Sequence, residues 1–476
     1  MHLDRDIPSV DSPTTMDVDQ PPPHSAHCTA AKYTGTIPLL IIEILCAYLK
    51  DVLHSSESLL GFPDPLIYTT NIHHPYRGLL DDANRHLLST ISLVHRSWTT
   101  PARDAIKTRL SLDLLKENDY AWFARSSLCG PWVRELQIYD DISFIALSPD
   151  EDAETDDAPE VDIIKHFPYL RALMLSVYEV ATVLSRIIDI GSLGGYLRSL
   201  HVQATVWTTP ALVQLRILVT QLPNLTTLSI LGIWYLDRSV SEEDTASLRA
   251  VQHIPPPSSL KGLMIELQDD VQHRETFVPH IQWFLEARDG FALEDLRLCV
   301  RHEPKSILES VKCDTVDHLL PAMESTLPHL KLLDVRTWAR TPDEECLSST
   351  PNLLRTINSR CPALEELHVD IFRMKSTWDK LVLPKTLRRL HVFTTELNGD
   401  TSFKALNRVL TTGRLPNLRE VCYSSFYVDA AGEWDPPSPL RKICRKRRIA
   451  LKDYYDAEIK CTWGRGRREP MFRSNN

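Results

Sequence analysis

The stretch Leu170-Arg171-Ala172-Leu173-Met174-Leu175 decides the fold, because its pattern returns along most of the 476-residue chain. In this pattern, one apolar residue is followed three positions later by two further apolar residues that have one residue between them. The first residues of the ten copies are Val133, Leu170, Leu197, Leu225, Leu260, Leu293, Leu330, Leu364, Leu387 and Leu418. The intervals between Val133 and Leu418 average about 32 residues, which indicates a chain of repeats rather than a set of unrelated domains.

Each copy ends in an alternation of apolar and other residues, which is typical of a β-strand. Segments with apolar residues at three- and four-residue spacing predict helices between the copies, at Val180–Ile190, Pro210–Leu222, Phe277–Ala287, Val316–Met323, Pro351–Asn358 and Phe403–Leu410. One strand and one helix cannot bury their apolar faces alone, whereas stacked copies cover one another. The sequence therefore predicts an α/β fold of about ten irregular leucine-rich repeats, a solenoid whose curved parallel sheet carries outer helices.

Within each predicted strand, the residue between the two alternating apolar positions should point onto the concave surface of the sheet. We call these residues the concave row: Gln137, Met174, His201, Ser229, Met264, Arg297, Asp334, His368, His391 and Cys422. The row is mixed and mostly polar, which favours a protein target over a small apolar ligand. We expect five of its members to contact that target: His201, Arg297, Asp334, His368 and His391. A solvated sheet face without a partner is the alternative.

Two histidines of the concave row, His368 and His391, should be neighbours in adjacent repeats. Glu366 and Asp370 flank the first histidine, and Arg389 flanks the second. Two histidines are too few for a typical metal site, so the sequence predicts neither a metal ion nor another cofactor.

Three tryptophans, Trp207, Trp234 and Trp338, follow or end predicted strands and should lie on one rim of the sheet. Aromatic side chains often anchor protein interfaces, so we add these three to the expected target-binding residues. The alternative is that they pin loops to helices.

Two helical stretches precede the repeats. Ile37–Leu49 begins with a proline near its first turn, and Leu87–Trp98 ends in Leu93-Val94-His95-Arg96-Ser97-Trp98. These stretches resemble the two halves of an F-box, although Leu40 stands where that family usually has Glu. The resemblance implies docking on the Skp-type adaptor of a cullin–RING ubiquitin ligase. The residues carried over from the family pattern are Pro38, Ile41, Leu45, Leu49, Leu93, Val94 and Trp98.

The chain thus divides into four parts. A disordered tail at 1–36 precedes an F-box-like helical domain at 37–110, which carries an insertion at 50–86. The solenoid follows at 111–460, and a mobile tail ends the chain at 461–476. An acidic loop at 147–162 holds eight acids and no base, whereas residues 441–476 hold twelve bases against four acids. The formal net charge of −10 therefore says little about the partner.

The basic run Arg441–Arg448 invites a nucleic-acid interpretation. Leu440, Ile443 and Cys444, however, have the spacing of a helix face, and the residues from Ile449 onward alternate as in a strand. We interpret this segment as the last helix and strand of the solenoid, and nucleic-acid binding as the less favoured alternative.

No catalytic or nucleotide-binding motif occurs in the sequence, so we expect a non-enzymatic protein. The ten cysteines form no Cys-x-x-Cys pair and should be reduced and mostly buried, in the cytoplasm or nucleus. The longest apolar stretch, Ile37–Leu49, is shorter than the roughly 20 residues that span a bilayer. The sequence therefore predicts a ubiquitin-ligase substrate receptor with an unknown protein target. A repeat scaffold without a ubiquitin role is the alternative.

Overall fold

The computed structural model describes residues 109–113, 133–139, 161–191, 193, 195–236, 242, 246, 249, 253–268, 274–286, 292–302, 315–339, 351–370, 382–394, 400–411, 415–425 and 438–453. Within these ranges, one twelve-stranded sheet runs through the molecule in the order β1 to β12, so each strand pairs with the next strand of the chain. Every one of these pairings is parallel. The predicted α/β architecture with a parallel sheet is confirmed.

The strands are β1 Arg109–Asp113, β2 Glu135–Tyr139, β3 Ala172–Glu179, β4 Ser199–Thr208, β5 Thr227–Leu236, β6 Gly262–Gln268, β7 Asp295–His302, β8 Leu332–Ala339, β9 Glu366–Asp370, β10 Arg389–Thr394, β11 Glu420–Ser425 and β12 Ala450–Asp453. The α-helices are α6 Ala181–Ile190, α7 Thr209–Thr220, α9 Arg274–Leu285, α10 Thr315–Met323, α11 Pro351–Arg360, α13 Asp400–Thr411 and α14 Ser438–Arg447. Two short 3₁₀ helices, η3 Val161–His166 and η5 Leu327–His329, complete the described elements.

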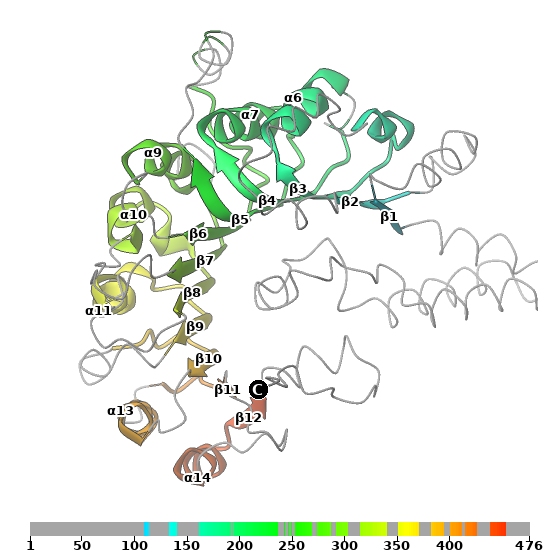
Figure 1. Cartoon of the computed structure of the whole chain (residues 1–476). Helices are drawn as coiled ribbons and strands as arrows, with labels where there is room; N and C mark the ends of the chain where they lie inside the picture. Colours follow the sequence, from blue (N-terminus) through cyan, green and yellow to red (C-terminus); the bar gives the residue numbers. More distant parts are fainter. Residues whose placement is uncertain are drawn as a thin grey trace, which may run out of the picture.

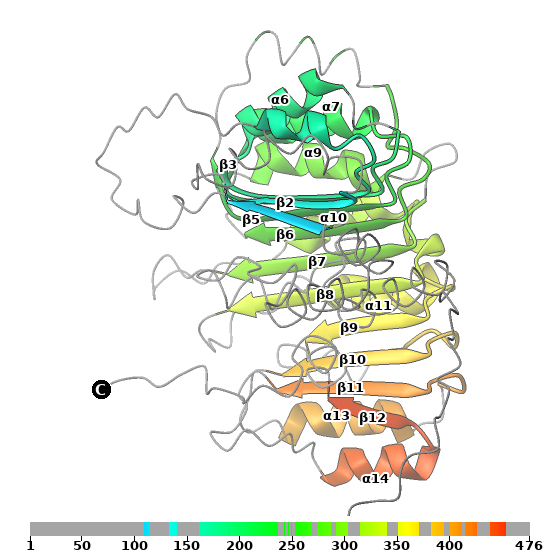
Figure 2. The same ribbon diagram turned by 90° about the vertical axis from the view of Figure 1, so that its right-hand side faces the viewer.

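The sheet is curved, and the labelled helices lie along its outer side (Figure 1). Turned by 90°, the strands follow one another like the rungs of a ladder (Figure 2). All six helices predicted from apolar spacing are present, at α6, α7, α9, α10, α11 and α13. The interpretation of the basic segment as a helix followed by a strand is also confirmed, by α14 and β12, which are the last elements among the described residues.

The structure differs from the predicted boundaries in two places. Strand β1 begins at Arg109, before the predicted start of the solenoid at 111. The repeat pattern misses this strand because Lys107 stands where the first apolar residue belongs. Of the residues in the acidic loop predicted at 147–162, Val161 and Asp162 belong to η3, and 147–160 lie outside the described residues.

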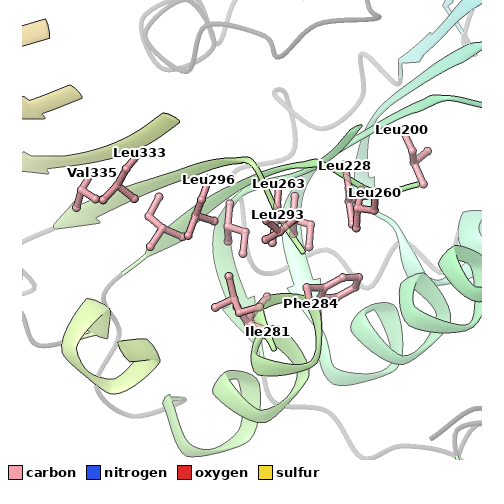
Figure 3. Packing of buried hydrophobic residues seen from close by; sticks show 14 of the residues in the cluster. Leu200, Leu228, Leu260, Leu263, Ile281, Phe284, Leu293, Leu296, Leu333 and Val335 are labelled. Atoms are coloured by element: carbon pink, nitrogen blue, oxygen red, sulfur yellow. The ribbon is translucent and has the colours of Figure 1, made fainter. Parts of the chain in front are cut away.

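The leucines of the repeat pattern form the core. The middle apolar residue of every copy is fully buried: Leu136, Leu173, Leu200, Leu228, Leu263, Leu296, Leu333, Leu367, Leu390 and Val421. Figure 3 shows Ile281 and Phe284 of α9 extending from the helix toward leucines of the sheet. Each such side chain contributes about 1.5–3 kcal/mol through its removal from water, so the stacked repeats stabilise one another.

A tight turn precedes most of the strands. In Leu222-Pro223-Asn224-Leu225, the amide of Leu225 donates to the carbonyl of Leu222 at 3.1 Å, with proline at the second turn position, which its fixed φ favours. The same bond recurs from Leu170 to Phe167 and from Leu364 to Cys361, both at 3.2 Å. The turn explains why proline often stands two residues before the first leucine of a copy.

Successive repeats are also held in register by a repeated backbone contact. The carbonyl of Arg171 accepts hydrogen bonds from the amides of Arg198 and Ser199, at 2.7 and 3.0 Å. The carbonyl of Arg198 accepts from Thr226 and Thr227 at the same two distances. Because the contact recurs from one strand to the next, equivalent positions of neighbouring repeats face one another across the sheet.

Within the described part of the chain, the helices are all too short or too polar to span a lipid bilayer. The four cysteines described, Cys299, Cys361, Cys422 and Cys444, are buried thiols that form no disulfide bond, in agreement with the prediction for them.

Candidate functional site

The concave row predicted from the sequence forms a continuous line across the sheet. From Gln137 to Cys422, each member is the register partner of the next. The line extends to Ser111 of β1 and to Lys452 of β12, two residues that the repeat pattern did not include. The alternation of side chains along each strand therefore predicted this arrangement correctly.

The accessibility of the row differs from the expectation of an open surface. Nine of its ten predicted members are buried, among them His201, Asp334, His368 and His391, and only Arg297 is half-buried. Parallel strands lie about 4.8 Å apart, so neighbouring side chains of one row touch and cover one another. Direct contact with a protein target is therefore easier for Arg297 and for the residues beside the row, such as Arg389, whose side chain is 57% exposed.

In the first part of the row, His201 of β4 lies between two neutral hydroxyl groups. Its Nε2 is 2.9 Å from Oγ of Ser199, and its Nδ1 is 2.8 Å from Oγ of Ser229 in β5. Both ring nitrogens are thus used in hydrogen bonds within the sheet. This histidine links two neighbouring repeats, which is a structural role.

In the second part of the row, histidines meet carboxylates instead. We call the following residues the carboxylate–histidine cluster: Asp334, Glu366, His368, His391, Glu420 and Cys422. Oε1 of Glu366 lies 2.8 Å from Nε2 of His368 and 3.2 Å from Nε2 of His391. The two imidazoles are stacked, with ring centroids 3.9 Å apart and planes 10° from parallel. Oδ2 of Asp334 lies 3.4 Å from Nδ1 of His368, on the other side of the ring.

Two cations, Arg389 in a flanking position and Lys452 at the end of the row, balance part of the negative charge of the cluster. Arg389 contacts Oε2 of Glu366 at 3.3 Å, and Lys452 contacts Oε2 of Glu420 at 2.7 Å. The thiol of Cys422 donates to Oε1 of Glu420 at 3.3 Å. The Oε1 atom of Glu366 is therefore directed toward the histidines, while its other oxygen faces the solvent-exposed arginine.

The protonation of the cluster follows from burial and from these contacts. Burial alone would raise the pKa of Glu366, but the hydrogen bonds from His368 and His391 outweigh it and hold that pKa well below its usual range. Burial and the neighbouring His368 lower the pKa of His391 to about 4. Burial and Glu420 raise the pKa of Cys422 above its ordinary value. At neutral pH, His391 is therefore a neutral imidazole beside an ionised carboxylate.

Two sets of side chains in the cluster place possible metal-ligating atoms within 4.8 Å of one another. One set is Glu366, His368 and His391, and the other is His391, Glu420 and Cys422. From the sequence, Glu366 was expected only as a flanking charge and not as a third ligand. The signal was present, because a residue two positions before His368 lies on the same face of a strand.

Beside Arg297, the sheet surface has a hollow of about 310 Å³. It is lined by Thr226, Thr227, Lys261, Gly262, Glu294, Asp295 and Arg297. Gly262 stands in the flanking position of β6, where a residue without a side chain leaves space open. Arg297 itself is held by Asp295, whose Oδ1 lies 3.2 Å from Nε of the guanidinium group.

Of the three tryptophans assigned to a rim, Trp207 has a packing role. Its Nε1 donates to the carbonyl of Leu231 at 2.8 Å, and the side chain is buried. Gly232 makes room for the ring, because a Cβ at that position would lie 2.1 Å from a carbon of the indole. Trp234 and Trp338 lie in β5 and β8, and their side chains are outside the described set. Trp207 thus packs strand β4 against strand β5, which is a different role from the expected pinning of a loop to a helix.

The last helix carries the basic run. In α14, Leu440 and Cys444 are buried against the repeats, whereas Arg441, Lys442 and Lys446 are exposed. Nη2 of Arg447 donates to the carbonyl of Leu415 at 3.0 Å, so this arginine holds α14 against the turn before β11. Arg441, Lys442 and Lys446 thus lie on the exposed side of α14, whereas Arg447 packs against the turn before β11.

The predicted adaptor-binding residues lie outside the described part of the chain: Pro38, Ile41, Leu45, Leu49, Leu93, Val94 and Trp98. No protein-family model and no curated protein matches this chain. The F-box resemblance therefore depends on the residues of the two stretches at 37–49 and 87–98 themselves.

Proposed function

We propose that this protein is the substrate-receptor subunit of a Skp–cullin–F-box-type ubiquitin ligase, with an F-box at 37–110 and leucine-rich repeats that bind a protein target. The observation that carries the proposal is the sheet of twelve parallel strands, whose labelled helices all lie on its outer side (Figures 1 and 2). Solenoids of this kind use their extended inner surface to hold partners. The F-box-like stretches stand directly before the repeats, the order that such a receptor requires.

In this function, the protein supplies proximity rather than chemistry. The F-box side chains would bury their apolar surface in the adaptor, and the repeats would hold the target beside the ligase. The surface around Arg297 is the best-supported place for the target, because this arginine is half-buried where the other predicted members of the row are buried, and it lines a hollow. Arg389 beside the row and Lys452 at its end are exposed and would extend that contact toward the end of the solenoid.

A repeat scaffold without a ubiquitin role would use the same surface, and the exposed bases of α14 keep nucleic-acid binding as a further alternative. Binding of the protein to a nucleic acid, measured at increasing salt concentration, tests the nucleic-acid alternative, because contacts to phosphates weaken steeply as salt rises. A binding signal independent of salt excludes it.

Co-purification with a Skp-type adaptor separates the receptor from the scaffold. We expect the unaltered protein to bind the adaptor and a Leu93→Ala/Trp98→Ala variant to lose this binding. A Val382→Ala variant is the matched control, because Val382 is an exposed apolar residue of the solenoid. Absence of binding by the unaltered protein would overturn the proposal, and equal binding by the double variant would place the docking surface elsewhere. Circular dichroism of each variant shows that the fold is retained.

A further inference from the structure

We propose that Glu366, His368 and His391 form a binding site for Zn²⁺ on the inner side of β9 and β10. This inference goes beyond the proposed function and does not depend on it. It also departs from the sequence-based expectation of no metal, which counted two histidines and left out the carboxylate.

The separations of the ligand atoms fit one zinc ion. With bonds of about 2.1 Å, the corners of a tetrahedron around Zn²⁺ lie about 3.4 Å apart. Oε1 of Glu366 lies 2.8 Å from one imidazole Nε2 and 3.2 Å from the other. All three ligand atoms lie within 4.8 Å of one another. A turn of one imidazole ring, without a large change in these separations, would therefore bring the three atoms to bonding distance of a single ion.

A second carboxylate is placed to orient one of the ligands. Histidines that bind zinc usually donate the proton of their other ring nitrogen to a carboxylate or carbonyl, which fixes the ring and raises its basicity. Asp334 occupies that position, with Oδ2 at 3.4 Å from Nδ1 of His368. When Nε2 binds zinc, the proton of the neutral ring resides on Nδ1, beside Asp334.

The local charge also suits a dication. Four carboxylates lie along this part of the sheet, on Asp295, Asp334, Glu366 and Glu420, and their cationic neighbours are Arg297, Arg389 and Lys452. Among these groups, negative charges outnumber positive charges by one. Imidazole nitrogen ligands together with a carboxylate favour Zn²⁺ over Mg²⁺ or Ca²⁺, which require oxygen ligands.

The stacked rings show what must change on binding. Parallel imidazoles direct their nitrogen lone pairs alongside each other, so one ring must turn out of the stack for both to reach the same ion. The side chains of Glu366 and His391 are 18% and 10% exposed, but both ring nitrogens of His391 are buried, so an ion reaches them only when that ring turns. Three protein ligands leave a fourth position for water.

His201 provides a matched control within the same molecule. It occupies the equivalent position of β4, but its ring nitrogens face the hydroxyls of Ser199 and Ser229 rather than carboxylates. A His201→Ala variant therefore removes a buried histidine of the same row without removing a proposed ligand.

The test is a calorimetric titration of the full chain with ZnCl₂, after treatment with a chelator and its removal. We expect one equivalent to bind, and MgCl₂ to give no signal. Glu366→Gln and His391→Ala should each weaken binding by about 100-fold or more, and Asp334→Asn by about 10–100-fold. His201→Ala should bind as the unaltered protein does. X-ray absorption of the loaded protein should show nitrogen and oxygen ligands and no sulfur.

Several outcomes would overturn the proposal. One is the failure of the unaltered protein to bind one equivalent of Zn²⁺. Another is that Glu366→Gln and His391→Ala bind Zn²⁺ as tightly as the unaltered protein does. A sulfur ligand together with loss of binding in Cys422→Ser would place the ion in the alternative set of His391, Glu420 and Cys422. Thermal melts without zinc identify a variant that fails to fold, and Glu366→Gln keeps the side-chain shape, so at least one ligand variant remains informative.

Discussion

His201 in β4 and the pair His368 and His391 in β9 and β10 occupy the same position of their repeats, yet they have different surroundings. His201 lies between two serine hydroxyls. His368 and His391 stack on each other and share the carboxylate of Glu366. The comparison shows that the repeat decides where a side chain lies, whereas the residues two positions earlier and in the next strand decide its chemistry.

The flanking position at the start of each strand follows the same division. In β3, β4 and β5 it holds Ala172, Ser199 and Thr227, all uncharged. From β9 to β11 it holds Glu366, Arg389 and Glu420. The flanking position is therefore uncharged from β3 to β5, which we call the neutral part, and charged from β9 to β11, the charged part, whereas β1 and β2 hold Arg109 and Glu135 there.

The largest expected effect is one that both parts share. Leu200→Ala in the neutral part and Leu390→Ala in the charged part each remove a fully buried side chain of the leucine core. Each should lower the free energy of unfolding by about 2–5 kcal/mol, through lost burial and the cavity left behind. Urea unfolding followed by circular dichroism measures both. A much smaller loss for one variant would show that the two parts are not equivalent in packing.

The next effect is a difference between the two parts in how their contribution to stability depends on pH. The pKa of His391 is lowered to about 4 in the folded protein, from a model-compound value of 6.5. Between these values the unfolded chain binds a proton that the folded chain does not, so stability should fall as the pH drops from about 6.5 to about 4. The low pKa of Glu366 adds a further loss only below about 4.5, as that carboxylate is forced to take up a proton.

On chelator-treated protein, the part of the acid-induced loss in the free energy of unfolding that His391 causes should be up to about 3 kcal/mol. His391→Ala should reduce it, and His201→Ala should leave it in place. An unchanged pH profile in His391→Ala would contradict the assignment of the acid sensitivity to the carboxylate–histidine cluster.

A smaller effect concerns the packing of the neutral part. Gly232→Ala should destabilise the protein by about 1–3 kcal/mol, because its Cβ would collide with the buried indole of Trp207. Gly195→Ala is the control, since a Cβ there has no neighbour within 4 Å. Thermal unfolding of both variants tests the packing role of Trp207, and equal melting temperatures would contradict it.

The smallest expected effect is the coupling between the two parts. Ser229→Ala removes a hydrogen-bond partner of His201, at a cost of about 1–3 kcal/mol for a buried group left unsatisfied. β4 and β10 are six strands apart, which is about 29 Å at the strand spacing of a sheet. The losses in Ser229→Ala and His391→Ala should therefore add to within about 0.5 kcal/mol in the double variant. A larger coupling energy would show that the solenoid transmits changes along its row.

Much of the fold could be predicted because its information is local. The positions of Leu173 and Leu200 in their copies predicted buried strand residues, and the spacing of apolar residues predicted α6 and α13. The repeat pattern did not predict strand β1, because Lys107 stands at its first apolar position. The burial of the concave row could not be predicted from alternation alone, since alternation assigns a face and not the neighbours that cover it.

By itself, the sequence determined the repeat, the core leucines and the order of the concave row, because each depends on spacing within a few residues. The tertiary structure alone decided which side chains from different repeats meet. Glu366 contacts His391, Asp334 contacts His368 and Trp207 packs on Gly232. These pairs are more than twenty positions apart in the sequence, and only the register of the strands brings them together. Register is a property of the whole stacked sheet, since it depends on how the intervening turns and helices pack.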